Sequence, residues 1–242
     1  MIKFFRKIRQ NLLMENKTGK HFKYAIGEII LVDIGILIAL QINNWNENRK
    51  SEIEAQNYYR QILIEIKNER KYIDSQINRL EISITTYDNY VEFVKNPKLK
   101  PIEVIQALEK VDLSFGFFNF FNETFETLES TGDLKLIPKN IRNKLIEIQH
   151  LKEWLVKQQS LNDLTYGQAL LKPIQLGYFR LLKHPEPHQG IDVQKNMEDI
   201  IISLEAAFVA KNFTEKDKIN NLNQLIELNT KLEDLITLEL EK

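Results

Sequence analysis

The hydrophobic pattern of the chain changes near residue 45. Residues 24–45 are almost continuously apolar, and eleven of the eighteen residues from 25 to 42 are Ile, Leu or Val. Beyond that run, apolar residues recur at spacings of three and four, most regularly from Tyr59 to Val94. A continuous apolar run predicts a buried or membrane-spanning helix, and the 3–4 spacing predicts amphipathic helices. The pattern therefore predicts an all-α chain.

The apolar run is long enough to cross a lipid bilayer. At 1.5 Å per residue it would span roughly 33 Å, about the hydrocarbon thickness of a membrane. Each Ile or Leu favours insertion by about 0.3 to 0.6 kcal/mol, whereas a central Asp costs about 3 kcal/mol, so Glu28 and Asp33 offset much of the gain. We predict a transmembrane helix over residues 24–45. A buried helix of a soluble protein and a cleaved signal peptide are the alternatives.

Basic residues are concentrated before this run. Residues 1–24 carry seven Lys or Arg and one acid, whereas only Arg49, Lys50 and Arg60 follow in the comparable stretch. The positive-inside rule then places the N-terminus in the cytoplasm and the C-terminal part outside. The expected organisation is a basic amphipathic segment (1–23), the transmembrane helix (24–45) and an all-helical domain (46–242).

The basic segment 1–23 is expected to lie on anionic lipid headgroups, because its start combines an apolar helical face with Lys and Arg. A disordered tail that only sets the topology is the alternative. The apolar run that follows favours a membrane over nucleic acid as the partner of this segment.

A helical wheel assigns the polar and small residues of the apolar run to two faces. Glu28, Gly35 and Ala39 share one face, where the small pair would allow close approach of a second helix. Asp33 lies nearly opposite, among aliphatic residues. We expect Asp33 to be protonated or to meet a partner in an oligomer. The alternative is that Asp33 has no functional role and is merely tolerated in this helix.

The helical domain is predicted to begin with one long helix, because residues 36–96 contain no Gly or Pro. Two series of positions repeat every seven residues: Tyr59, Ile66, Ile73, Leu80, Tyr87 and Val94, and Leu63, Arg70, Ile77, Ile84 and Val91. Such a stripe is typical of a helix in an antiparallel bundle with coiled-coil-like packing. Further helices are predicted over 102–112, 124–131 with Gly132 as its left-handed stop, from Pro138 toward Gly167, 191–210 and 214–240. Residues 172–190 are predicted to be irregular.

A phenylalanine-rich segment follows the first long helix. Its six phenylalanines are Phe115, Phe117, Phe118, Phe120, Phe121 and Phe125. They are interpreted as core residues that close the helical domain, or as the lining of an apolar groove for a ligand or partner.

Candidate catalytic chemistry is scarce. The chain has no Cys, and it contains no phosphate-binding loop, dinucleotide motif, nucleophile elbow or paired-His zinc helix. His184 and His188 flank Glu186 and suggest a metal site, but the two intervening prolines prevent a helical pair, which favours ordinary loop residues. We therefore expect no enzyme, metal or cofactor.

Two stretches carry a resemblance to a known family: GEIILVDIGILIALQINNWNENRK (27–50), preceded by FFRKIRQNLL, and TFETLESTGDLKLI (124–137). They resemble an uncharacterised bacterial single-pass membrane family, a domain of unknown function numbered 6090. The resemblance implies a Gram-negative inner-membrane protein with a periplasmic helical domain, and no assigned activity. Asp33 departs from the expected pattern, in which an aliphatic residue would stand there.

Two functions are compatible with these features. The first is an anchored, non-enzymatic module that binds an envelope protein or self-associates. The second is a ligand-binding sensor domain that acts through a separate signalling partner, since about two dozen cytoplasmic residues cannot hold an output domain. A deep Phe-lined pocket would favour the sensor, and a flat apolar strip would favour assembly.

Overall fold

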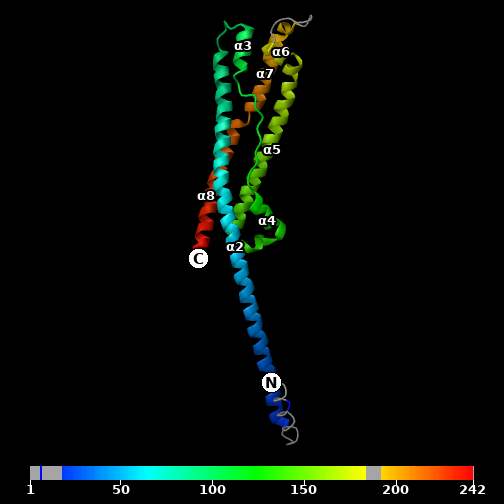
Figure 1. Cartoon of the computed structure of the whole chain (residues 1–242), viewed down its shortest axis with the longest axis vertical. Coiled ribbons are helices and arrows are strands. Elements are labelled where there is room, and N and C mark those ends of the chain that lie inside the picture. Colours follow the sequence, from blue (N-terminus) through cyan, green and yellow to red (C-terminus); the bar gives the residue numbers. More distant parts are fainter. Residues whose placement is uncertain (1–5, 7–17, 184–191, 242) are drawn as a thin grey trace. The chain divides into compact units, whose positions relative to one another are not determined.

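The computed structural model describes residue 6, residues 18–183 and residues 192–241, and every regular element in them is a helix. In chain order the elements are α2 (Thr18–Phe93), α3 (Pro101–Leu108), α4 (Glu123–Thr131), the 3-10 helix η1 (Asp133–Leu136), α5 (Lys139–Gln175), α6 (Tyr178–Lys183), the 3-10 helix η2 (Val193–Asn196), α7 (Met197–Asn212) and α8 (Glu215–Leu240) (Figure 1). The prediction of an all-α chain is confirmed.

The chain divides into two compact units, Met1–Gln56 and Asn57–Lys242, and α2 contributes residues to both. These units are defined by contacts within the chain. The boundaries predicted after residues 23 and 45 mark where the chain would enter and leave a membrane, and they stay a prediction. The expectations for the basic segment 1–23 fall mostly on residues outside those that the structure describes.

The apolar run of α2 exposes its aliphatic side chains. Every Ile, Leu and Val from residue 26 to residue 42 is at least half exposed. None of the apolar window of α2 is buried against the rest of the described chain, and the helix is long and apolar enough to be a candidate membrane span. A helix of a soluble core would bury such a face.

The ends of the shorter helices follow local sequence rules. Pro101 occupies the first turn of α3, where the missing N–H costs nothing. Gly132 ends α4 at φ +77°, in the left-handed region that favours glycine, as predicted.

The predicted end of the next helix near Gly167 is wrong, because α5 continues to Gln175. A Cβ added at Gly167 would lie 3.5 Å from the ring of Phe115, so this glycine lies where an aromatic ring approaches the helix. Pro173 is tolerated in the last turn of α5, where it removes one helical hydrogen bond near the end of the ladder. The chain turns at Gly177, whose φ is +99°, and α6 follows, so only part of residues 172–190 is irregular; residues 184–190 lie outside the described ones.

In the second unit, α2, α5 and the consecutive helices α7 and α8 lie alongside one another (Figure 1). Ion pairs and hydrogen bonds fix their order. Glu69 of α2 meets Lys152 of α5 and Asn229 of α8, whereas Ser83, further along α2, meets Glu215, further back on α8. Lys218 of α8 bonds Asn162, further along α5 than Lys152. Residue numbers therefore rise together on α2 and α5 and fall on α8, so α8 runs opposite to the other two.

The buried face of α2 only partly follows the predicted heptad stripe. Its first series is buried at Tyr59, Ile66, Ile73 and Leu80. The second series is half-buried, and Val91 is exposed. The other buried series is Ile62, Glu69, Ser83 and Tyr90, and two of its members are polar. The face of α2 toward α5 and α8 therefore includes the polar residues Glu69 and Ser83, which make the contacts described next.

Candidate functional site

The four residues singled out in the apolar run all belong to α2. Asp33, Gly35 and Ala39 are exposed and Glu28 is half-buried. A Cβ added at Gly35 would meet no atom within 4 Å. The intramembrane contact proposed for these residues stays a prediction.

Residues 113–122 of the phenylalanine-rich segment form no regular element, and exposed and buried residues alternate from Phe115 to Phe120, whereas Phe125 lies in α4. Phe118 and Phe120 are buried and stack on each other, with ring centroids 5.5 Å apart. Phe115 and Phe117 are exposed, although Phe115 also lies 5.0 Å from the ring of Tyr166 on α5. Phe121 and Phe125 are half-buried. The structure thus divides the six rings between core and surface, and a common groove stays a prediction.

Tyr72 of α2 holds this segment in place. Its ring packs edge-on against Phe120 at 5.9 Å, and its hydroxyl accepts a hydrogen bond of 2.8 Å from the backbone N–H of Asn119. Asn119 is exposed, and this hydrogen bond gives its backbone N–H a protein acceptor in place of water. Tyr72 therefore replaces the backbone partner that an extended segment outside a sheet lacks.

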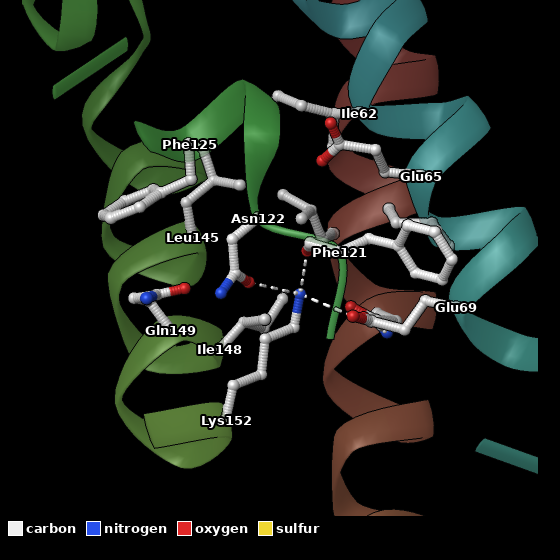
Figure 2. Close-up of a pocket in the computed structure, with 13 residues that line it drawn as sticks. Ile62, Glu65, Glu69, Phe121, Asn122, Phe125, Leu145, Ile148, Gln149 and Lys152 are labelled. Atoms are coloured by element: carbon white, nitrogen blue, oxygen red, sulfur yellow. Dashed lines mark hydrogen bonds and ion pairs between the residues drawn. The ribbon is translucent and has the colours of Figure 1, made fainter. Parts of the chain in front are cut away.

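A buried ion pair lies where this segment ends (Figure 2). The Lys152 ammonium donates to the Phe121 carbonyl at 2.8 Å and to Asn122 Oδ1 at 3.3 Å, and lies 2.6 Å from Glu69 Oε1. The other oxygen, Glu69 Oε2, accepts 2.6 Å from the amide of Asn229. The Lys152 and Glu69 side chains are only 9% and 2% exposed. This polar junction, defined as Glu69, Lys152, Asn229 and the 121–122 backbone, links α2, α5 and α8 to the start of α4.

The polar junction borders a cavity of about 30 Å³. One or two water molecules would fill that volume, whereas pockets for organic ligands measure roughly 300–1,000 Å³. A wider hollow of about 300 Å³ is open to the surface beside α2 and α4; its lining is Gln61, Ile64, Glu65, Glu123, Thr124 and Thr127. No phenylalanine contributes to that lining. Neither space is a deep Phe-lined pocket.

A second polar layer lies further along α2 and α5. Lys218 of α8 is 1% exposed and donates to Asn162 Oδ1 at 2.8 Å, and Glu215 accepts from the hydroxyl of Ser83 at 3.1 Å. Burial lowers the pKa of Lys218 to about 8, although the nearby Glu215 acts in the opposite direction. Burial also raises the pKa of Glu215. Both groups are therefore held in an environment that disfavours their charged forms.

A third buried cation, Lys211 of α7, reaches the segment between α3 and the phenylalanines. Its ammonium lies 2.8 Å from Asp112 Oδ2 and 5.6 Å from the ring centre of Tyr166. Burial alone would raise the pKa of Asp112, but the hydrogen bonds from Lys211 and Ser114 outweigh it and lower that pKa. Lys152 and Lys211 thus form ion pairs with Glu69 and Asp112, whereas the buried Lys218 and Glu215 each bond a neutral side chain.

Sequence reasoning missed Glu69, Lys152, Glu215 and Lys218. Within a 3–4 pattern, a charged residue is interpreted as solvent-facing, and only the opposing helix shows that it is buried. One sequence signal indicated the burial of Glu69: Glu69 and Ser83 share a seven-residue spacing with Ile62 and Tyr90, so all four lie on one face of the helix.

The part of the chain that the structure describes holds no group of three or more His, Cys, Asp or Glu side chains that could bind a metal ion. His184 and His188, the pair considered above, lie outside that part. At the polar junction the Lys152 ammonium bonds Glu69 and the Phe121 carbonyl, and the cavity beside them measures about 30 Å³.

Comparison with known proteins places the chain in a family without assigning an activity. No curated protein and no solved structure matches it. A family model, described as a family of unknown function (DUF6090), matches residues 28–171, more than half of the chain. The matched region includes Asp33, the phenylalanine-rich segment and, of the polar junction, Glu69 and Lys152. The chain therefore belongs to the DUF6090 family, as its apolar run and the TFETLESTGDLKLI stretch predicted.

Proposed function

We propose that this protein is a single-pass inner-membrane protein whose helical domain, an antiparallel bundle in the periplasm, is a non-enzymatic module that binds a protein partner. The observation that carries the binding role is an apolar strip on the outer face of α7. Ile202, Ala206, Val209 and Phe213 recur at helical spacing, and Ile202, Val209 and Phe213 are 65%, 53% and 82% exposed.

The strip lies opposite the buried face of α7. Ile200, Leu204, Ala207 and Phe208 are fully buried on the inner face, so α7 is apolar on two sides. A surface helix needs only one apolar stripe for its own fold. A second, aligned stripe is typical of a helix that another apolar surface covers.

Charge indicates what kind of partner fits the strip. Glu198 and Asp199 are exposed at the start of α7, and its one lysine, Lys211, is buried in an ion pair. Negative charge therefore lies beside the N-terminal end of the strip. A complementary partner is an amphipathic helix with an apolar stripe and basic flanks.

The membrane part of the proposal is supported by the fully exposed apolar run of α2 and by the excess of basic residues before it. The competing sensor function would need a ligand-sized pocket with converging polar groups. The cavity at the polar junction has room for only one or two waters, and the larger hollow is open and has no aromatic lining, so these spaces favour the interaction module.

A photo-crosslinking residue at Ile202 in the full-length chain, expressed in its native membrane, tests this function. We expect one crosslinked protein whose attached peptide is an apolar helix with basic flanks, and loss of that adduct when Phe213→Glu places a charge in the strip. The same probe at Lys231, an exposed position on α8, is the matched control and should give no adduct. Absence of an adduct at Ile202, or an adduct between two copies of this chain, would overturn the assignment.

A further inference from the structure

Asp33 stands at the centre of an aliphatic stripe of α2. Ile26, Ile30, Leu37 and Leu40 lie on the same helical face as Asp33, because the five positions follow one another at steps of four, three, four and three residues. All four aliphatic side chains are more than half exposed. This is the spacing of a seam between two helices, with one polar position in it.

The carboxyl of Asp33 cannot reach water from the middle of a bilayer. The residue is eight positions from Ala25 and nine from Ile42, about 12 Å from either end at 1.5 Å per residue. Long Lys and Arg side chains can extend toward the interface, but the Asp side chain is too short to do so. Insertion of Asp at the helix centre costs about 3 kcal/mol. Within the described chain the structure shows no hydrogen bond or ion pair of Asp33, and its side chain is exposed.

We infer that two copies of this chain associate through this face of α2, with the Asp33 carboxyls hydrogen-bonded to each other; the inference rests on the proposed membrane insertion. Copies inserted by the same signals have the same orientation, so equivalent positions of a parallel pair meet at the same depth. A protonated carboxyl both donates and accepts. Two Asp33 side chains that share one or two protons therefore satisfy each other without a second kind of chain.

The opposite face provides the control. Gly35 and Ala39 lie across the helix from Asp33, with Glu28. If the small residues formed the contact instead, the seam positions would face lipid. Contact through the Asp33 face and contact through the Gly35 and Ala39 face therefore bring different engineered cysteines together. The chain has no native Cys, so no other disulfide can form between two copies.

The test uses the full-length chain with a single cysteine, reconstituted in vesicles of phosphatidylethanolamine and phosphatidylglycerol and oxidised. Leu37→Cys is expected to give a disulfide-linked dimer, and Ala39→Cys is not. In the Leu37→Cys chain, Asp33→Leu should lower dimer yield about fivefold or more, because the apolar seam alone has no hydrophobic driving force in lipid. Asp33→Asn should largely retain the dimer, because an amide also pairs with itself.

Extraction of each variant with alkaline carbonate separates the two ways of failing. A chain released from the vesicles would refute the proposed membrane insertion. A chain that stays inserted but crosslinks better at Ala39→Cys, or equally with Asp33→Leu, would overturn this inference alone. Loss of the dimer with Asp33→Asn would also overturn it, because a side chain that can still pair with itself by hydrogen bonds would then not suffice.

Discussion

Replacement of Lys152 by Met is predicted to be among the most destabilising single substitutions in the second unit. The change removes the ammonium but keeps a side chain of similar length, so packing is largely preserved. What remains is the Glu69 carboxylate, 2% exposed, with one hydrogen bond from Asn229. The Phe121 carbonyl also loses its donor.

The expected loss is about 3–5 kcal/mol in the free energy of unfolding, the usual cost of removing one partner from a buried ion pair. Most of that loss is the penalty of a stranded charge and not the net value of the pair. Adding Glu69→Gln to Lys152→Met removes the charge and keeps an acceptor for Asn229. The double variant should therefore regain about 2 kcal/mol or more relative to Lys152→Met alone.

Urea unfolding of the full-length chain in micelles measures these values. The chain has two tryptophans. Trp154 lies on α5 close to Lys152, so a Trp45→Phe background leaves it as the only tryptophan reporter. Arg70→Met is the matched control: Arg70 neighbours Glu69 and pairs with Glu233 of α8, but these side chains are 35% and 39% exposed, so we expect a loss below about 1 kcal/mol. Equal losses for Lys152→Met and Arg70→Met, or no recovery in the double variant, would refute the burial argument.

Three further predictions concern other parts of the second unit. Gly177→Ala should destabilise the folded chain more than Gly132→Ala. Both substitutions place an L-residue at positive φ, which costs about 1–2 kcal/mol, but only Gly177→Ala also places a Cβ 2.8 Å from a neighbouring side chain. The urea midpoints of the two variants measure the difference. The free energy of unfolding of the wild-type chain should rise as pH increases from about 8 toward 10, because in that range Lys218 is deprotonated in the folded state and still protonated in the unfolded state. Urea unfolding at several pH values should show that Lys218→Met removes this increase. Tyr72→Phe should speed hydrogen exchange at the amide of Asn119 at least several-fold, since the hydroxyl that accepts its hydrogen bond is gone, and unchanged exchange there would contradict the proposed role of Tyr72.

Much of the helical content could be predicted from local signals. Gly132 ends α4 because its left-handed conformation favours glycine, and Pro101 begins α3 because the first turn tolerates a missing N–H. Gly167 was misjudged for the converse reason. A glycine within a helix looks like a stop, but here the ring of Phe115 packs beside it, and that ring comes from a distant segment.

The polar junction could not be predicted, because its chemistry depends on partners far apart in sequence. Glu69 and Asn229 are separated by 160 residues. Each alone is interpreted as a solvated residue on a helix face. Their burial follows only when α8 is known to run opposite to α2, and a sequence pattern gives the period of a helix without its neighbour.

The central claim is that residues 24–45 cross a membrane and place the helical domain in the periplasm. Because the chain has no Cys, a single cysteine at Lys157, exposed on α5, or at Lys3 can be tested with a membrane-impermeant maleimide in cells whose outer membrane alone is permeabilised. We predict labelling of Lys157→Cys in these cells and labelling of Lys3→Cys only after the inner membrane is broken. Protection of Lys157→Cys until lysis, or recovery of the full-length chain in the soluble fraction without detergent, would contradict the account.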